Sequence, residues 1–319
     1  MSTDELRAGV ELTNLDQPLF SGAGATKREL IDYLDAMHEP MIAGLSGRPL
    51  SVVRALRGQA PFMQKNLPKY APDWIAQVPI WAAASKREVH YPLCNDRRTL
   101  LWYANQRAVE YHVTLTRVDE VDEPDYLVLD IDPPEGAAFE VAVRAAGLVR
   151  AALDELGLAG AVKTSGAKGV HIFVPVCAAD REQVAAATRA LAARAEQLDP
   201  TVATTEYVRA DRDGKVFLDS TRAGGATVVA AYSPRLRAGS PVSFPLDWDE
   251  LDQVVPGDFT LHTAPALLAG RDRWAQLLPD RQRLPDALIE QGRQLPIARV
   301  QAMHAGKRRA RDRKQADGK

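Results

Sequence analysis

The sequence predicts an α+β fold, on three observations. Short apolar strands alternate with amphipathic helices between Tyr126 and Asp219, and their order implies mixed strand directions within one sheet. The region before them is interrupted by prolines and is typical of short strands and loops. No run of about 18 uncharged apolar residues is present, which excludes a membrane-spanning helix.

The composition is that of a globular protein, with 319 residues of which 46% are hydrophobic and 26% charged. This length suffices for one large domain or two small ones. The two cysteines, Cys94 and Cys177, lie far apart and outside any C-x-x-C pair. We therefore expect neither a disulfide framework nor a thiolate zinc site, and interpret both as small apolar residues.

Basic residues are unevenly distributed along the chain. The formal net charge is −2, but residues 47–117 hold eleven Lys or Arg against four Asp or Glu, a local +7 that leaves −9 for the rest. The last thirteen residues, KRRARDRKQADGK, hold seven basic residues against two acidic ones. Such clusters can bind the phosphates of a polyanion, or they can be a solvated face and a disordered, solubilising tail.

The N-terminal third begins with one predicted helix over residues 24–45, GATKRELIDYLDAMHEPMIAGL. Thr26 and Glu29 form a capping box, and apolar residues recur on one face of the helix. Between Gly47 and Leu100, six prolines break the chain while aromatic residues alternate with basic ones. This pattern predicts short strands and loops, and would also suit a surface that stacks nucleobases.

The central part predicts a strand at 126–132, a helix at 139–158, a strand pair within 162–176, a helix at 181–198 and a strand at 215–219. Past Pro245 the periodicity is lost, which indicates a peripheral extension.

Two aspartates, Asp130 and Asp132, end the apolar strand YLVLDID, and prolines follow them. Side chains alternate along a strand, so both carboxylates point to one face. Such a pair is costly unless a cation lies between them, and oxygen ligands suit Mg²⁺ or Mn²⁺. A D-x-D pair alone can also be a pair of exposed turn residues. Asp219 ends a second apolar strand in the same way, and three carboxylates could hold the two metal ions of a phosphoryl transfer.

The stretch TSGAKGVH, residues 164–171, supplies groups that complement a phosphate. Gly166 and Gly169 allow a tight backbone turn, Ser165 and Lys168 can donate to phosphate oxygens, and His171 returns on the next strand. No Gly-Lys-Ser/Thr follows, so this is not a Walker loop. Alone, it could be a glycine-rich hairpin with a satisfied histidine; beside three strand-end aspartates, a metal–triphosphate pocket is the better interpretation.

Four motifs in this order resemble the polymerase domain of the bacterial ligase D family, a branch of the archaeo-eukaryotic primase superfamily. They are LVLDIDPP, KTSGAKGVHIFVP, VFLD and GGATVVAAYSPRLRAGSPVSFPLDWDEL. The resemblance spans about residues 10–260. TKRELIDYL, GRPLSVVR and PFMQKNLPKYAPDW resemble its N-terminal blocks, and the last is similar to stand-alone actinobacterial enzymes called primase-polymerase C. The implied fold is an RNA-recognition-like sheet with helices, joined to an irregular N-terminal α/β module.

The resemblance also implies the roles of individual residues. Two divalent ions, Mn²⁺ or Mg²⁺, would be held by Asp130, Asp132 and Asp219, the catalytic residues. The nucleotide would be bound by His112, Ser165, Gly166, Lys168, Gly169, His171 and Arg235. The residues implied to face DNA are Lys27, Arg54, Phe62, Met63 and Lys65.

Two positions depart from the family pattern. Gln17 stands where a lysine is usual, and Met63 where a second aromatic residue is usual. Both lie in the region that reads the downstream 5′-phosphate and the template, so an end-joining role is less supported than the chemistry.

We expect a template-dependent, metal-dependent nucleotidyltransferase that extends primers at short gaps or breaks in DNA and prefers ribonucleotides. The alternatives are a de novo primase, an end-joining polymerase acting with a ligase, and a non-catalytic module that binds DNA ends. The expected partners are gapped or primed DNA, nucleoside triphosphates and a separate ATP-dependent DNA ligase.

The N-terminus lacks the basic-then-apolar order of a signal peptide, so we expect a cytoplasmic, nucleoid-associated protein without a membrane partner. One domain is predicted over residues 1–300. It comprises an N-terminal module at about 10–110, a catalytic core at about 111–260 and a peripheral extension at 261–300, followed by a basic tail at 301–319.

Overall fold

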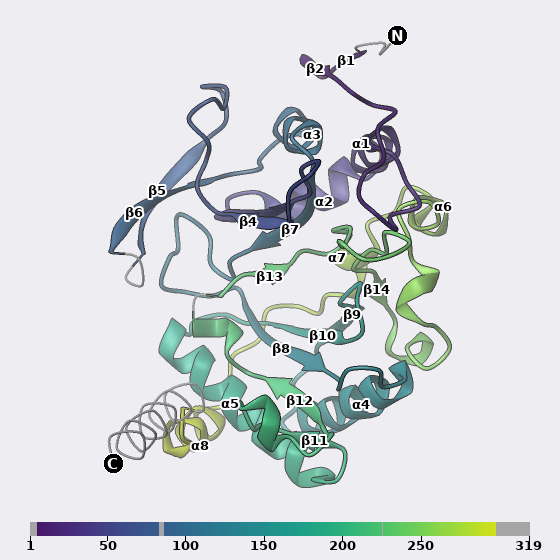
Figure 1. Ribbon diagram of the computed structural model, residues 1–319. Helices are drawn as coiled ribbons and strands as arrows, with labels where there is room; N and C mark the ends of the chain where they lie inside the picture. Colours follow the sequence, from purple (N-terminus) through teal and green to yellow (C-terminus); the bar gives the residue numbers. More distant parts are fainter. Residues whose placement is uncertain (1–4, 83–85, 225, 298–319) are drawn as a thin grey trace, which may run out of the picture.

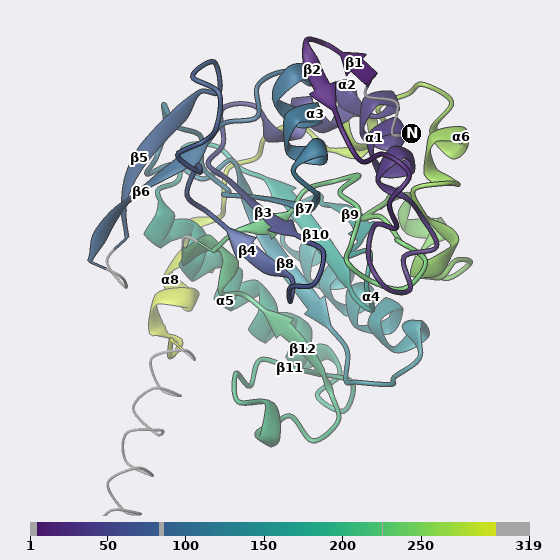
Figure 2. The same cartoon turned by 45° about the horizontal axis from the view of Figure 1, so that its top comes forward.

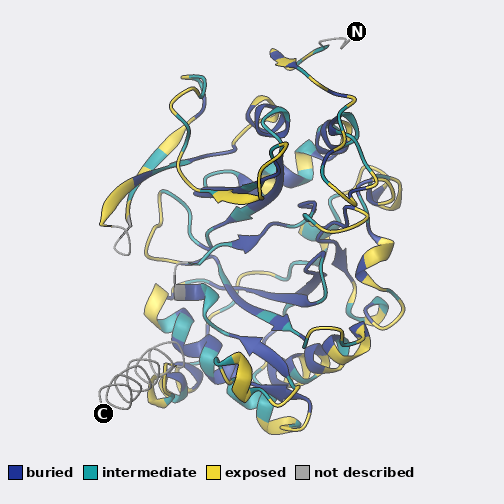
Figure 3. Ribbon diagram, in the orientation of Figure 1, coloured by how far each residue is buried: buried dark blue, intermediate teal, exposed yellow. Residues whose placement is uncertain are grey.

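The computed structural model describes residues 5–82, 86–224 and 226–297. The predicted basic tail and the last residues of the predicted extension lie outside these ranges. Two β-sheets of six and four strands, two hairpins and the covering helices make up the described part of the molecule (Figure 1), and the cores of both larger sheets are buried (Figure 3). This confirms the predicted α+β class. No helix in the described part of the chain is long and apolar enough to cross a membrane.

The larger sheet has six strands in the order β11-β12-β8-β10-β9-β14. Neighbouring strands are antiparallel except for β11 and β12. Helices α4 (Phe139–Glu155) and α5 (Arg181–Leu198) cover one face of this sheet. The strands are β8 (Tyr126–Asp132), β9 (Ala161–Thr164), β10 (Val170–Pro175), β11 (Ala203–Thr204), β12 (Val216–Asp219) and β14 (Pro245–Leu246). The central strands and helices therefore form where the sequence predicted them.

The smaller sheet has the strand order β13-β7-β3-β4 and lies against the open face of the larger one. The two sheets meet where Lys163 of β9 donates to the carbonyl of Val229 in β13. The strands are β3 (Leu50–Arg54), β4 (Phe62–Gln64), β7 (Ala108–Val113) and β13 (Val228–Val229). Two hairpins flank this sheet, β1 (Glu5–Arg7) with β2 (Val10–Leu12), and β5 (Gln77–Ala82) with β6 (Arg87–Pro92).

The single N-terminal helix predicted over residues 24–45 is in fact two helices, α1 (Lys27–Ala36) and α2 (His38–Leu45). The predicted capping box of Thr26 and Glu29 is present. The break follows from Pro40, which has no backbone N–H and therefore cannot bond to the carbonyl of Ala36 in a continuous helix. Pro40 instead lies in the first turn of α2, where an N–H has no partner in any case. Helix α3 (Arg97–Asn105) packs on α1 and α2.

The segment after Pro245 is less peripheral than the sequence indicated. Strand β14 pairs with β9 at the edge of the larger sheet, and Phe259 stacks on Phe244 in the core. Helix α8 (Asp286–Gln294) packs so closely on α5 that a Cβ added to Gly292 would lie 1.8 Å from the carbonyl oxygen of Ala186. The short helices α6 (Ala264–Leu268) and α7 (Arg273–Leu277) lie between β14 and α8 in sequence.

Candidate active site

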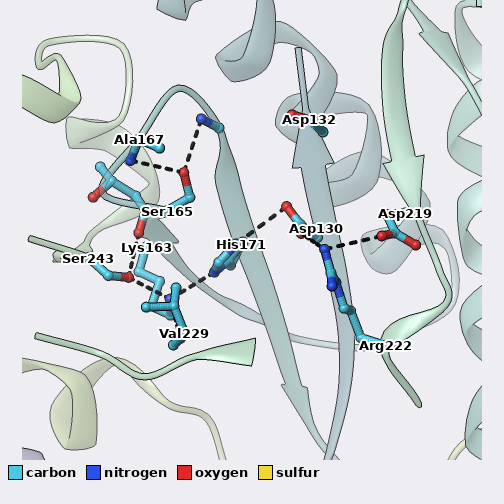
Figure 4. A network of polar contacts seen from close by, with 12 residues as sticks. Asp130, Asp132, Lys163, Ser165, Ala167, His171, Asp219, Arg222, Val229 and Ser243 are labelled. Carbon is cyan, nitrogen blue, oxygen red and sulfur yellow. Dashed lines mark hydrogen bonds and ion pairs between the residues drawn. The ribbon is translucent and has the colours of Figure 1, made fainter. Parts of the chain in front are cut away.

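One row of side chains crosses four strands of the larger sheet. Lys163 on β9 pairs with His171 on β10, His171 pairs with Asp130 on β8, and Asp130 pairs with Asp219 on β12. Directly paired residues point to the same face of a sheet, so all four side chains face the smaller sheet. Figure 4 shows them in this order. The strand register thus brings together residues that are 89 positions apart in sequence.

Asp130 lies between two basic groups. Its carboxylate is 3.3 Å from Nε2 of His171 and 2.5 Å from Nη2 of Arg222. Burial alone would raise the pKa of Asp130, but His171 and Arg222 together hold that pKa well below its usual value. The carboxylate is therefore ionised at neutral pH.

Asp219 shares the same cation. Its Oδ2 lies 3.3 Å from Nη2 of Arg222, while Oδ1 accepts from the N–H and the hydroxyl of Thr221 at 2.8 and 2.6 Å. Burial lowers the pKa of Arg222, but the two aspartates outweigh burial and raise it above its usual value. One guanidinium thus forms ion pairs with two carboxylates on neighbouring strands.

Asp132 lies at the outer end of β8 and is more open, with 42% of its side chain exposed. It is 3.2 Å from Nζ of Lys168 and 3.7 Å from Nη1 of Arg212. Lys168 also donates to the carbonyl of Pro133 at 2.7 Å.

These carboxylates fit the divalent ions that the sequence implied. Asp130 and Asp219 already converge on one positively charged atom, and carboxylate oxygens are the ligands that Mg²⁺ and Mn²⁺ prefer. No group of three or more acidic, histidine or cysteine side chains in the described part of the chain is already arranged as a metal site. Metal binding by all three aspartates therefore requires Arg222, Lys168 and Arg212 to give way.

The connection between β9 and β10 forms a tight turn beside Asp130. Ser165 Oγ accepts from the N–H groups of Ala167 and Gly169 at 3.2 and 3.1 Å (Figure 4). Gly166 has φ +68°, and a Cβ there would lie 2.6 Å from Arg235. A Cβ at Gly169 would lie 2.1 Å from the carbonyl oxygen of Ile131. Only glycine fits at either position, as the turn predicted from TSGAKGVH requires.

A buried carboxylate ties two of the predicted nucleotide residues together. Glu110 accepts from Nε2 of His112 at 2.8 Å and lies 3.2 Å from Nε of Arg235. Arg235 also donates from Nη1 to the carbonyl of Ser165. Burial would raise the pKa of Glu110, but its hydrogen bonds to His112 and the N–H of Leu236, and the positive charge of Arg235, lower that pKa to about 2. Glu110 thus fixes where Arg235 points.

Comparison with known proteins adds the decisive observation. The model of the family described as LigD, primase-polymerase domain, matches residues 26–274. The chain belongs to this family. Its members are nucleotidyltransferases that depend on divalent metal ions, so the chain is an enzyme of that class.

The chain is also similar to several LigD proteins. The multifunctional non-homologous end joining protein LigD of Mycolicibacterium smegmatis is 34% identical over 248 residues, which cover 76% of this chain and 32% of the relative. The bifunctional LigD protein of Bacillus subtilis is 32% identical over 260 residues, which cover 80% of this chain and 41% of the relative. The chain thus spans about a third of the length of the first relative and about two fifths of the second.

A solved structure shares this fold over most of the chain. The polymerase domain of Mycobacterium tuberculosis ligase D, determined in complex with DNA, has a TM-score of 0.77 and 30% sequence identity. The match covers 87% of this chain and all of that one. The predicted primase-polymerase fold is therefore confirmed.

The primase-polymerase domain contains site residues that sequence reasoning missed. Lys163 is fully buried and bonds to His171 Nδ1 at 2.8 Å, Ser243 Oγ at 2.6 Å and the carbonyl of Val229 at 3.1 Å. Burial lowers the pKa of Lys163 well below its usual value. A lysine inside the apolar strand AVKT was an available signal. Glu110 could have been found because it alternates with His112, and Arg222 because it follows Asp219 by three residues.

The predicted DNA-facing residues of the primase-polymerase domain divide into two groups. Phe62, Met63 and Lys65 are exposed on and just after β4, at the edge of the smaller sheet. Arg54 is buried instead: its guanidinium lies 5.8 Å from the Phe62 ring and donates to Gln64 and Tyr70. The structure therefore gives no support for a direct contact of Arg54 with DNA. The guanidinium of Arg54 instead packs against the ring of Phe62.

Lys27 does not face the surface either. Only 3% of the residue is exposed, and its Nζ donates to the carbonyl of Thr13 and, at 2.6 Å, to Asn105. Burial lowers the pKa of Lys27 to about 8. In this structure the ammonium of Lys27 is buried and already has protein partners, and its contact with DNA stays a prediction. Gln17 lies nearby, in a cavity of about 560 Å³ that is also lined by Arg57 and Arg107.

Proposed function

We propose that the chain extends the 3′-hydroxyl of a primer with nucleoside triphosphates, on a DNA template, at short gaps or breaks, and prefers ribonucleotides. The observation that supports this best is the row in which Asp130 and Asp219 share one cation directly beside His171. Carboxylates for metal ions and donors for phosphates thus lie side by side, as a nucleotidyl transfer requires.

Each residue of the proposed site has a definite task. Ser165, Lys168, His171 and Arg235 would bind the triphosphate and offset the charge that develops on the leaving pyrophosphate. Asp130, Asp132 and Asp219 would hold two divalent ions, Mn²⁺ or Mg²⁺, which when bound polarise the attacking hydroxyl and the reacting phosphate. The nucleotide pocket would be shaped by Gly166 and Gly169, because no larger residue than glycine fits the turn. His112 would line the same pocket.

DNA is proposed to lie over the exposed edge of the smaller sheet. The related Mycobacterium tuberculosis domain was determined with DNA, which supports a nucleic-acid substrate for this chain. Phe62 and Met63 have 38% and 45% of their area exposed, and Lys65 follows them. Exposed apolar and basic side chains in this order suit base stacking and phosphate contact.

The biological setting follows from the same relatives, which are named for non-homologous end joining. We propose that the chain acts on the chromosome together with an ATP-dependent DNA ligase that seals the filled gap. A de novo primase, a dedicated end-joining polymerase and a non-catalytic DNA-end-binding module are the competing functions.

One extension assay, read beside DNA binding, separates the proposed function from the primase and from the non-catalytic module. Gapped, nicked and unprimed templates are each incubated with ribonucleotides or deoxynucleotides in Mn²⁺ or Mg²⁺, with Asp219→Ala as the control for contaminating polymerases. Extension of the gapped primer, faster with ribonucleotides, is expected. Products on the unprimed template would support a primase, and binding without any product would support the non-catalytic module.

A further inference from the structure

A cavity of about 450 Å³ adjoins the carboxylate row on the side away from the triphosphate residues. Its walls come from the β5–β6 hairpin, the connection between β7 and β8, and the short helix η2 (Arg222–Gly224). Arg222 lines the cavity and also contacts Asp130 and Asp219. The cavity therefore begins within one side-chain length of the predicted metal site.

The in-line geometry of phosphoryl transfer indicates which substrate lies on the Arg222 side of the carboxylate row. Ser165 and Arg222 lie on opposite sides of Asp130 (Figure 4). The residues proposed to hold the leaving pyrophosphate all lie toward Ser165. In a phosphoryl transfer the attacking oxygen and the leaving group are roughly in line on opposite sides of the reacting phosphorus. The primer 3′-hydroxyl must therefore approach from the side of Arg222.

The lining of the cavity suits a nucleoside. One wall of the cavity is apolar and is formed by Trp81, Tyr91, Leu115 and Val121. The charged side chains among the described residues that line the cavity are Arg181 and Arg222. Its volume lies within the range of roughly 300–1,000 Å³ that is usual for small-ligand sites. An apolar wall beside basic groups matches the base and the phosphate of a nucleotide.

Trp81 is the most informative of these residues. It has 65% of its area exposed on the β5–β6 hairpin, which stands out from the body of the molecule (Figure 2), and its ring contacts no other aromatic ring of a described residue. An indole this exposed adds little to the core. Aromatic side chains at such positions bind single-stranded nucleic acid by stacking on bases, without sequence preference.

We propose that this cavity seats the 3′-terminal nucleoside of the primer strand, with Trp81 stacking on its base and Arg222 directed at the primer end. The inference rests on the proposed polymerase function and adds the subsite that positions the attacking hydroxyl. When the attacking hydroxyl is held in line with the reacting phosphorus, a large part of the activation barrier of a two-substrate reaction is removed.

Binding to the subsite is tested with a primer whose 3′-terminal base is 2-aminopurine, annealed in a gapped duplex without nucleotide. Stacking on Trp81 should quench its fluorescence on binding. The quench should be lost in Trp81→Ala and retained in Trp81→Phe. The matched control carries 2-aminopurine five nucleotides upstream, where all three proteins should give equal signals. An unchanged terminal quench in Trp81→Ala would overturn the proposal.

Steady-state extension provides the second readout. Trp81→Ala should raise KM for the primer by about tenfold and leave KM for the nucleotide unchanged. Val121→Trp, which fills the cavity from its exposed rim, should do the same. Equal primer KM values in all proteins would refute the subsite, whereas absence of primer extension by the unmodified protein would refute the proposed function itself. Melting curves confirm that both variants are folded.

Discussion

Lys163 Nζ lies 2.8 Å from Nδ1 of His171, and the partners of this lysine determine which ring nitrogen of His171 carries its proton. Ser243 donates its hydroxyl hydrogen to the carbonyl of Thr164 at 2.7 Å, so its oxygen must accept from Lys163. As an ammonium, with three hydrogens, Lys163 donates to Ser243, to the carbonyl of Val229 and to His171. Nδ1 of His171 accepts, and the proton lies on Nε2, which faces Asp130 at 3.3 Å. His171 thus presents a donor to the site.

Replacing Lys163 with methionine should disturb this arrangement without changing side-chain length. We expect His171 to lose its single Nε2–H tautomer, and kcat/KM for nucleotide to fall by about tenfold to a hundredfold because a phosphate donor is lost. Long-range ¹⁵N–¹H spectra of histidine-labelled protein report the tautomer directly. Ser243→Ala, which removes another partner of Lys163, is the matched control and should keep the tautomer. An unchanged His171 spectrum in Lys163→Met would contradict the assignment.

Asp130→Ala should abolish primer extension and leave DNA binding nearly intact, because phosphate contacts elsewhere supply the affinity. Extension assays and binding to a labelled gapped duplex measure the two properties on the same preparation. Asp252→Ala, at an exposed position away from the row, serves as the control. A variant at position 130 that keeps a tenth of the normal extension rate would exclude Asp130 as an essential ligand.

Arg222→Gln should strengthen metal binding. In the metal-free protein this guanidinium pairs with both Asp130 and Asp219, so a divalent ion must displace it or bind beside a like charge. We expect the Kd for Mn²⁺ to fall by about tenfold, measured by electron paramagnetic resonance of free Mn²⁺. Arg209→Gln, whose partner is Glu135 at 3.5 Å, should leave the Kd unchanged. Weaker Mn²⁺ binding in Arg222→Gln would mean that the arginine supports the metal site.

Glu110 should contribute to stability above pH 4.5 and lose this contribution as the pH falls. Its pKa is about 2 in the folded protein against the usual value of 4.5, so the unfolded state binds its proton first on acidification. The difference corresponds to roughly 3 kcal/mol, which is complete above pH 4.5 and is lost on descent toward pH 2. Urea unfolding at pH 7 and pH 3 should show a smaller pH dependence for Glu110→Gln than for the unmodified protein. Equal pH dependence would argue against an ionised Glu110 in the fold.

Gln17→Lys should increase the preference for a 5′-phosphorylated gap over a hydroxyl-ended one. A lysine there would add a charge-assisted hydrogen bond, worth roughly 1.5 to 3 kcal/mol. Binding of both substrates across a salt series should show a small preference in the unmodified protein and a slope steeper by up to about one counterion in the variant. Gln253→Lys, on an exposed turn, is the control. A preference above about thirtyfold in the unmodified protein would point instead to Arg57 and Arg107, which line the same cavity.

Local spacing by itself determined much of the fold and part of the candidate site. The alternation in YLVLDID placed Asp130 and Asp132 on one face of a strand, and Thr26 with Glu29 marked the start of α1. The glycines of TSGAKGVH marked a turn that no larger residue can form. These features depend on neighbours within a few residues, so the periodicity of helix, strand and turn is enough to predict them.

Only the tertiary structure decided which of these residues meet and which are buried. The row of Lys163, His171, Asp130 and Asp219 depends on the register of four strands, and no local pattern sets that register. Lys27 was expected at the surface, yet Thr13 and Asn105 enclose its ammonium. Burial and pairing of charges are set by segments distant in sequence, because the free energy of a charge depends on the partners and solvent that the whole fold places around it.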